Sequence, residues 1–145
     1  MGVLNIAVSA NSVSATKAEI NARGFQFHID EPQALGGTDS AANPVEYLLG
    51  AYAGCLNVMA HLIAKEQDIA IDNLSIDISG ELDTDKLFGS SQDVRAGFQN
   101  IKVVFNPKTN ASADKLASWL KAIDDRCPIN DNLKNLTPVK LLVAN

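Results

Sequence analysis

Two cysteines, Cys55 and Cys127, are the residues of this sequence best suited to covalent chemistry, and they lie 72 positions apart. A thiolate attacks peroxides and disulfides, and two thiols together can cycle between dithiol and disulfide. A standing disulfide is rare in a reducing compartment, so we expect two free thiols. Spacing alone leaves a second interpretation open, in which both are inert buried cysteines.

The local sequence around Cys127 favours a reactive thiol. Pro128 follows it and suits the first position of a helix, which places Cys127 near the N-cap. A thiol there faces unpaired amide groups, so we expect the pKa of Cys127 to fall. Arg126 adds a nearby positive charge, whereas Asp124 and Asp125 oppose it.

Cys55 is predicted to lie in the middle of a long helix. Asn43 suits the N-cap and Pro44 the first helical position, and the apolar pattern continues to about Gln67. The helix is apolar nearly all round, so it should be buried on most sides. Reactivity of Cys55 would therefore need a charged group brought to it by the fold.

The same helix bears on assembly. A membrane span is an alternative interpretation, but Glu46, Asn57 and His61 interrupt a stretch of barely sufficient length. Gly50 and Gly54 lie one turn apart, and glycine within a helix usually permits close approach of another backbone. A chain of this size has little material to cover such a helix, so we expect a homodimer.

The remaining elements predict a mixed α and β domain over residues 1–145. One strand alternates clearly, with Phe25, Phe27 and Ile29 on one face and His28 and Asp30 on the other. The expected strands cover 4–9, 12–20 with a turn at Asn11, 24–30, 71–83, 98–105 and 139–143, and the expected further helices cover 112–125 and 127–134, with a turn at 107–110.

Composition restricts the function further. The 145 residues carry a formal net charge of -5, which disfavours binding to nucleic acid or to an anionic membrane surface. The first residues lack a basic start and a long apolar run, so no secretory signal is expected and the cytoplasm is the predicted location.

Other active-site patterns are not found in the sequence. It has no phosphate-binding glycine loop or dinucleotide fingerprint. His28 and His61 do not stand at metal-ligand spacing with either cysteine, so neither a cofactor nor a metal is expected. A Cys-His dyad is a further alternative, although His61 lies six residues from Cys55 and thus on another helix face.

Two motifs resemble those of the OsmC/Ohr family. The run Asn43–Cys55 is similar to that family's central-helix motif, N/S-P-x-E-x-L-L-x-A-x-x-x-C, and Cys127–Ile129 resembles its C-P-[VIY] element. The lead-in Leu35–Gly37 fits as well. The resemblance implies an OsmC-like α/β (α+β) fold, with antiparallel sheets wrapped around long central helices in an intertwined homodimer.

The resemblance also implies a function, namely a thiol-dependent peroxidase in oxidative or osmotic stress defence. Cys55 would attack an organic hydroperoxide or hydrogen peroxide and become a sulfenic acid. Cys127 would then form a disulfide with it, and a dithiol reductant would restore both thiols.

The chain departs from the hydroperoxide-resistance branch in the two residues that activate the first cysteine there. Val45 stands in place of the activating Glu, while Glu46 comes one residue later and faces away from Cys55 on a regular helix. Arg23 matches the activating Arg only with a shift. Glu46 and Arg23 are therefore supporting candidates. The alternatives are a dimer that binds small apolar or electrophilic molecules without turnover, and a structural dimer with inert thiols.

Overall fold

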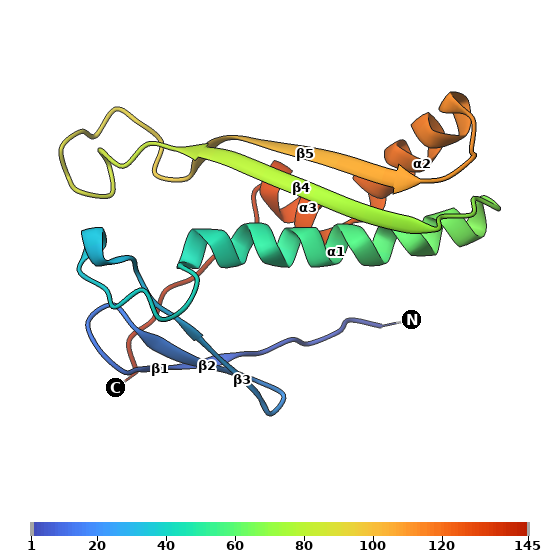
Figure 1. Ribbon diagram of the computed structural model, residues 1–145. Helices are drawn as coiled ribbons and strands as arrows, with labels where there is room; N and C mark the ends of the chain where they lie inside the picture. Colours follow the sequence, from blue (N-terminus) through green and yellow to red (C-terminus); the bar gives the residue numbers. More distant parts are fainter. Residues whose placement is uncertain (1, 145) are drawn as a thin grey trace. The chain divides into compact units, whose positions relative to one another are not determined.

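The computed structural model describes residues 2–144 and confirms a mixed fold of helices and antiparallel sheets (Figure 1). The chain divides into two compact units, Met1–Gly50 and Ala51–Asn145, and the boundary falls within one helix. A single domain over 1–145 stays a prediction. The elements in chain order are β1 (Ser9–Ser12), β2 (Ala18–Ala22), β3 (Phe25–Ile29), the 3₁₀ turn η1 (Gln33–Leu35), α1 (Pro44–Glu66), β4 (Asn73–Leu82), β5 (Phe98–Lys108), α2 (Ala113–Arg126) and α3 (Pro128–Lys134).

The first unit is built on a three-stranded antiparallel sheet in the order β1-β2-β3. Arg23 and Gly24 connect β2 to β3 with φ angles of 55° and 94°, the left-handed conformation of a two-residue hairpin turn. His28 is exposed on β3, and its Nε2 lies 3.6 Å from the Glu19 carboxylate on β2. His28 therefore faces solvent.

Asp30, at the end of β3, is completely buried, although the strand alternation placed it on the polar face. The loop that follows folds back over its carboxylate. One oxygen accepts hydrogen bonds from the backbone N–H and hydroxyl of both Thr38 and Ser40, and the other accepts from the Thr16 hydroxyl. These bonds, that of the Thr38 side chain foremost, hold the pKa of Asp30 well below its ordinary value.

Helix α1 begins where the sequence predicted and ends one residue before the predicted end. A reciprocal cap closes its start. The Asn43 side-chain oxygen accepts from the backbone N–H of Glu46 at 2.9 Å, and the Glu46 carboxylate accepts from the backbone N–H of Asn43 at 2.8 Å. This capping box satisfies two amide groups that the first turn would otherwise leave unpaired.

The second unit encloses the main core. Strands β4 and β5 form a long antiparallel hairpin with half-buried residues alternating along it, and α1 runs along one face of that hairpin (Figure 1). Trp119 on α2 is buried against α1, where its indole N–H donates to the Ala60 carbonyl at 2.8 Å, and its ring meets Phe105 of β5 edge to face. The buried core residues are Tyr52, Leu56, Met59, Ala60, Ile63, Ala64, Ile69, Trp119, Ile123 and Cys127.

Gly80 interrupts the apolar face of β4 for a reason that the hairpin reveals. The ring of Phe98 on β5 lies so close that a Cβ at position 80 would meet its carbons at 2.6 and 2.8 Å. The missing side chain therefore makes room for an aromatic ring on the paired strand.

Helix α1 also has the length and mean hydropathy, 1.4 over 18 residues, of a membrane span. The core helix of a globular protein meets the same criterion, and α1 supplies six of the buried core residues. Only 33% of that 18-residue window is buried, so packing within the chain accounts for part of its apolar character.

Two strand predictions and two turn predictions need correction. Asn11 lies within β1, and the turn comes instead at 13–16. Residues 4–8 and 139–143 adopt no secondary structure, because no strand of the described chain pairs with either segment and their apolar side chains are exposed. Pro107 extends β5 opposite Leu74 and does not begin a turn.

Candidate functional site

The fold brings the two cysteines together. The Cys127 Sγ lies 3.0 Å from the Cys55 Sγ, with the thiol of Cys127 as donor and the sulfur of Cys55 as acceptor. Both are free thiols. A disulfide requires about 2.05 Å between the sulfurs, so the pair is about 1 Å from bonding distance.

Cys127 occupies the joint between two helices. Its backbone N–H closes the end of α2 on the Ile123 carbonyl, and its side chain caps the start of α3 by accepting from the Asn130 N–H at 3.5 Å. Only 1% of Cys127 is exposed. The predicted N-cap position is confirmed.

The predicted fall in the pKa of Cys127 is wrong. Burial raises the pKa of this thiol, and the hydrogen bond to Cys55 raises it further. The amide groups of Asn130 and Ile129 act in the opposite direction but do not outweigh the loss of solvent. Cys127 is thus a protonated thiol at neutral pH.

Cys55 differs from Cys127 in its access to solvent. It is half-buried, on the edge of the α1 face that carries the core residues Tyr52 and Leu56. Of the two thiols, Cys55 is therefore the one that a dissolved reagent can reach.

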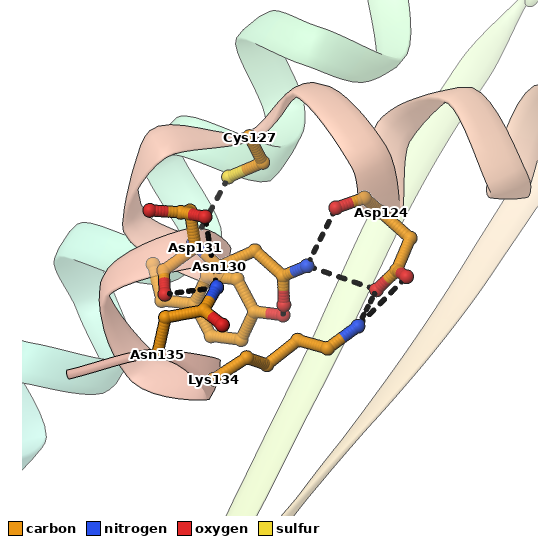
Figure 2. Close-up of polar contacts among 7 residues, drawn as sticks. Asp124, Cys127, Asn130, Asp131, Lys134 and Asn135 are labelled. Atoms are coloured by element: carbon orange, nitrogen blue, oxygen red, sulfur yellow. Dashed lines mark hydrogen bonds and ion pairs between the residues drawn. The ribbon is translucent and has the colours of Figure 1, made fainter.

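A polar network that is buried at Tyr52 and Asn130 and exposed at Asp124 and Lys134 lies beside Cys127 (Figure 2). The sequence analysis did not predict it. The Tyr52 hydroxyl donates to the Asn130 side-chain oxygen at 2.5 Å, and the Asn130 side-chain nitrogen donates to both the backbone carbonyl and the carboxylate of Asp124 at 2.8 Å. Lys134 donates to the same carboxylate at 2.8 Å. The only available signal was position: Tyr52 precedes Cys55 by three residues, and Asn130 follows Cys127 by three.

Charge and burial fix the proton state of this network. The hydrogen bond from Lys134, followed by that from Asn130, lowers the pKa of Asp124. Burial raises the pKa of Tyr52, and the nearby Cys127 and Asp124 raise it further. At neutral pH the network therefore runs from a protonated phenol to an ionised carboxylate.

An apolar cavity of about 420 Å³ has Tyr52 and Leu56 of α1 in its wall. Its walls come from α1, β5 and α2, and Asp124 is its one charged lining residue. The lining residues are Tyr52, Leu56, Val103, Val104, Phe105, Leu120, Ile123 and Asp124. Cys55 is the neighbour of Leu56 in the sequence but does not line the cavity itself.

The two supporting candidates are engaged in other contacts. Glu46 closes the cap of α1 with Asn43. Arg23 is exposed in the β2–β3 turn, with its guanidinium 5.3 Å from the centre of the Phe25 ring. Within residues 2–144, no group of three or more His, Cys, Asp and Glu side chains is arranged to hold a metal ion.

Comparison with known families decides the classification. The family model described as OsmC-like protein matches residues 37–142, well over half of the chain. The chain belongs to the OsmC-like protein family. A search of curated proteins found no match to this OsmC-like chain.

Solved structures show the same fold. An OsmC-like protein from Mycoplasma pneumoniae superposes with a TM-score of 0.80 at 20% identity, covering 92% of this chain and 89% of that one. An organic hydroperoxide resistance protein OsmC from Legionella pneumophila gives 0.66 at 16% identity, covering 92% of each chain. The organic hydroperoxide resistance protein OhrB of Bacillus subtilis gives 0.61 at 23% identity, covering 90% and 91%. The predicted OsmC-like fold is confirmed.

Proposed function

We propose that this OsmC-like protein is a thiol-dependent peroxidase in peroxide stress, with Cys55 as the attacking residue and Cys127 as the resolving one. The observation that carries the proposal is the 3.0 Å distance between two free thiols whose residues are 72 positions apart in the sequence. The printed names of the Legionella and Bacillus proteins, which describe organic hydroperoxide resistance, support a role of this kind.

The chemistry follows from the two environments. The half-buried Cys55, as a thiolate, attacks the terminal peroxide oxygen: an S–O bond forms, the O–O bond breaks, and the alcohol leaves with a proton. Cys127 then attacks the sulfenic sulfur of Cys55. The S–S bond forms, the hydroxyl leaves with the Cys127 proton as water, and a dithiol reductant restores both thiols by exchange.

The assignment of roles rests on burial. Cys127 is 1% exposed and its pKa is raised, so it is both shielded from a peroxide and protonated at neutral pH. A protonated thiol is a poor nucleophile, whereas a resolving thiol loses its proton only as the hydroxyl departs. Arg23 and Glu46 enter the proposal as supporting residues.

The preferred substrate is an organic hydroperoxide. The cavity beside Tyr52 and Leu56 is apolar and large enough for a small hydrocarbon group. Its position one residue along α1 from Cys55 would suit the organic part of such a substrate.

The working unit is proposed to be a cytoplasmic homodimer of single-domain chains. On α1, Val58 is 63% exposed and Leu62 44% exposed, and the apolar residues Leu141 and Val143 near the chain end are more than 90% exposed. Exposed apolar residues in this number are typical of a surface that a partner covers. Sedimentation velocity would measure the mass; a single 15.4 kDa species at micromolar concentration would exclude the dimer.

The experiment that tests the function is peroxide consumption with a dithiol reductant, for cumene hydroperoxide and hydrogen peroxide in parallel. We expect turnover in the wild type, no turnover in Cys55→Ser, and at most one reaction cycle in Cys127→Ser unless the added dithiol reduces the sulfenic acid directly. Undiminished turnover in Cys55→Ser would refute the proposal.

A second candidate is binding of small apolar molecules without turnover. Val45 stands where the hydroperoxide-resistance branch has its activating Glu, and the Glu46 carboxylate is occupied in a helix cap. Absence of turnover in the wild type, together with saturable binding of an apolar fluorescent probe, would favour this function.

A further inference from the structure

Asn130 is a buried amide with every side-chain polar group in use. It is 5% exposed, yet its side chain accepts from Tyr52 and donates twice to Asp124, while its backbone N–H approaches the Cys127 sulfur. One residue thus joins α1, the end of α2 and the start of α3. A buried polar group costs free energy unless it is paired, so this arrangement holds the three helices in one geometry.

The network has a single direction. The phenol of Tyr52 is protonated and the carboxylate of Asp124 is ionised, as their shifted pKa values require. A flipped Asn130 amide would direct its oxygen at two Asp124 oxygens, which are acceptors only. The side chain of Asn130 is therefore locked in one orientation.

The position of the Tyr52–Asn130 bond relative to the thiols is the decisive feature. Cys55 contacts Cys127, and Tyr52 contacts Asn130. Cys55 follows Tyr52 by three residues on α1, and its partner Cys127 precedes Asn130 by three residues. The two contacts therefore join the same two segments of the chain and lie about one helical turn apart.

We infer that Tyr52 and Asn130 are positioning residues of the thiol pair: their hydrogen bond holds the start of α3 against α1 and thereby sets how fast Cys127 resolves an oxidised Cys55. This rests on the proposed function for the peroxide step. Neither residue takes part in bond making. Their loss prolongs the life of the sulfenic acid on Cys55, which then proceeds with excess peroxide to the sulfinic acid.

The test separates the two chemical steps in Tyr52→Phe, which keeps the ring and removes the hydroxyl. Rapid mixing with hydrogen peroxide, which has no organic part to enter the cavity that Tyr52 lines, gives the rate of Cys55 oxidation, and the rate of disulfide formation follows by quenching and mass spectrometry. We expect disulfide formation to slow about tenfold, the equivalent of one buried hydrogen bond, with little change in the first step. More sulfinic acid on Cys55 should accompany it.

Matched variants control for folding. Tyr47→Phe removes the same atom from α1 at a residue whose ring packs on Phe27, and Asn132→Leu makes the corresponding change on the exposed side of α3. Both should resolve at the wild-type rate. Asn130→Leu should reproduce the defect, and the double variant with Tyr52→Phe should be no slower than Asn130→Leu alone, because the two changes remove one interaction.

Diamide distinguishes the failure of this inference from the failure of the proposed function. It oxidises two thiols to a disulfide and is itself reduced to the hydrazine, so the second thiol must attack the first without any peroxide. Slower disulfide formation in Tyr52→Phe with diamide supports positioning even where the wild type is inert to peroxide. Wild-type rates of disulfide formation in both Tyr52→Phe and Asn130→Leu would overturn it.

Discussion

Oxidation of Cys55 and Cys127 to a disulfide should stabilise the protein against unfolding by about 4 kcal/mol. The magnitude follows from the chain that the bond would close, because the cysteines are 72 residues apart. A loop of this length removes about 15 cal/mol/K of conformational entropy from the unfolded chain, which is about 4 kcal/mol at 25 °C.

The native geometry should leave most of this gain intact. The sulfurs lie 3.0 Å apart in the reduced protein, and bond formation requires an approach of about 1 Å. Because this approach is short, we expect little strain to offset the entropic term.

Urea unfolding measures the effect, followed by the fluorescence of Trp119, the single tryptophan, which is 1% exposed. With a dependence of about 2 kcal/mol per molar urea, the midpoint of the oxidised protein should lie about 2 M above that of the reduced protein. Both samples need the same protein concentration, since association would itself shift the midpoint.

Cys55→Ser is the control, and its midpoint should be the same with and without oxidant. Equal midpoints for oxidised and reduced wild type, with the disulfide verified by mass, would refute the reasoning. That result would mean that closing the bond distorts the native helices by as much as it restricts the unfolded chain.

Three further predictions concern stability. Trp119→Phe should lower the free energy of unfolding by about 1–3 kcal/mol in urea, followed by circular dichroism, because it removes a buried hydrogen bond to the Ala60 carbonyl and part of a buried ring from the core; an unchanged midpoint would contradict it. Folding raises the pKa of Cys127. The stability that this shift contributes is therefore fully present below the unfolded thiol pKa of about 8.5 and is lost as pH rises through the pKa of the folded protein. The free energy of unfolding of Cys127→Ser should accordingly fall less steeply with pH in the alkaline range than that of the wild type. Equal slopes would show that Cys127 does not contribute to this pH dependence. The pKa of Asp30 is lowered, so its stabilisation is present above about pH 4 and is lost in acid. Asp30→Asn should therefore be less stable than the wild type at pH 7 and should lose less stability on acidification, which a urea series between pH 7 and pH 3 would check.

The sequence by itself determined the elements that depend on local physics. Asn43, Pro44 and Glu46 specify the start of α1, because side-chain caps and a fixed proline φ act within one turn. Pro128 likewise placed Cys127 at the joint before α3. Alternating apolar residues gave the β4–β5 hairpin, and the two cysteine motifs gave the family.

Tertiary structure decided what depends on residues far apart in the chain. Alternation along β3 assigned Asp30 to a polar face, but a loop eight to ten residues later buries it. Strands predicted at 4–9 and 139–143 did not form, since a strand requires a hydrogen-bonded partner as well as a propensity.

The thiol site illustrates the same division. The local sequence predicted a lowered pKa for the Cys127 thiol. Burial against α1 raises that pKa instead, because desolvation depends on everything packed around the sulfur. The 3.0 Å contact between Cys127 and Cys55 joins residues 72 positions apart, and the hydrogen bond between Tyr52 and Asn130 joins residues 78 positions apart. The sequence shows which chemical groups the chain contains. Only the packing of α3 against α1 determines which of these groups come into contact.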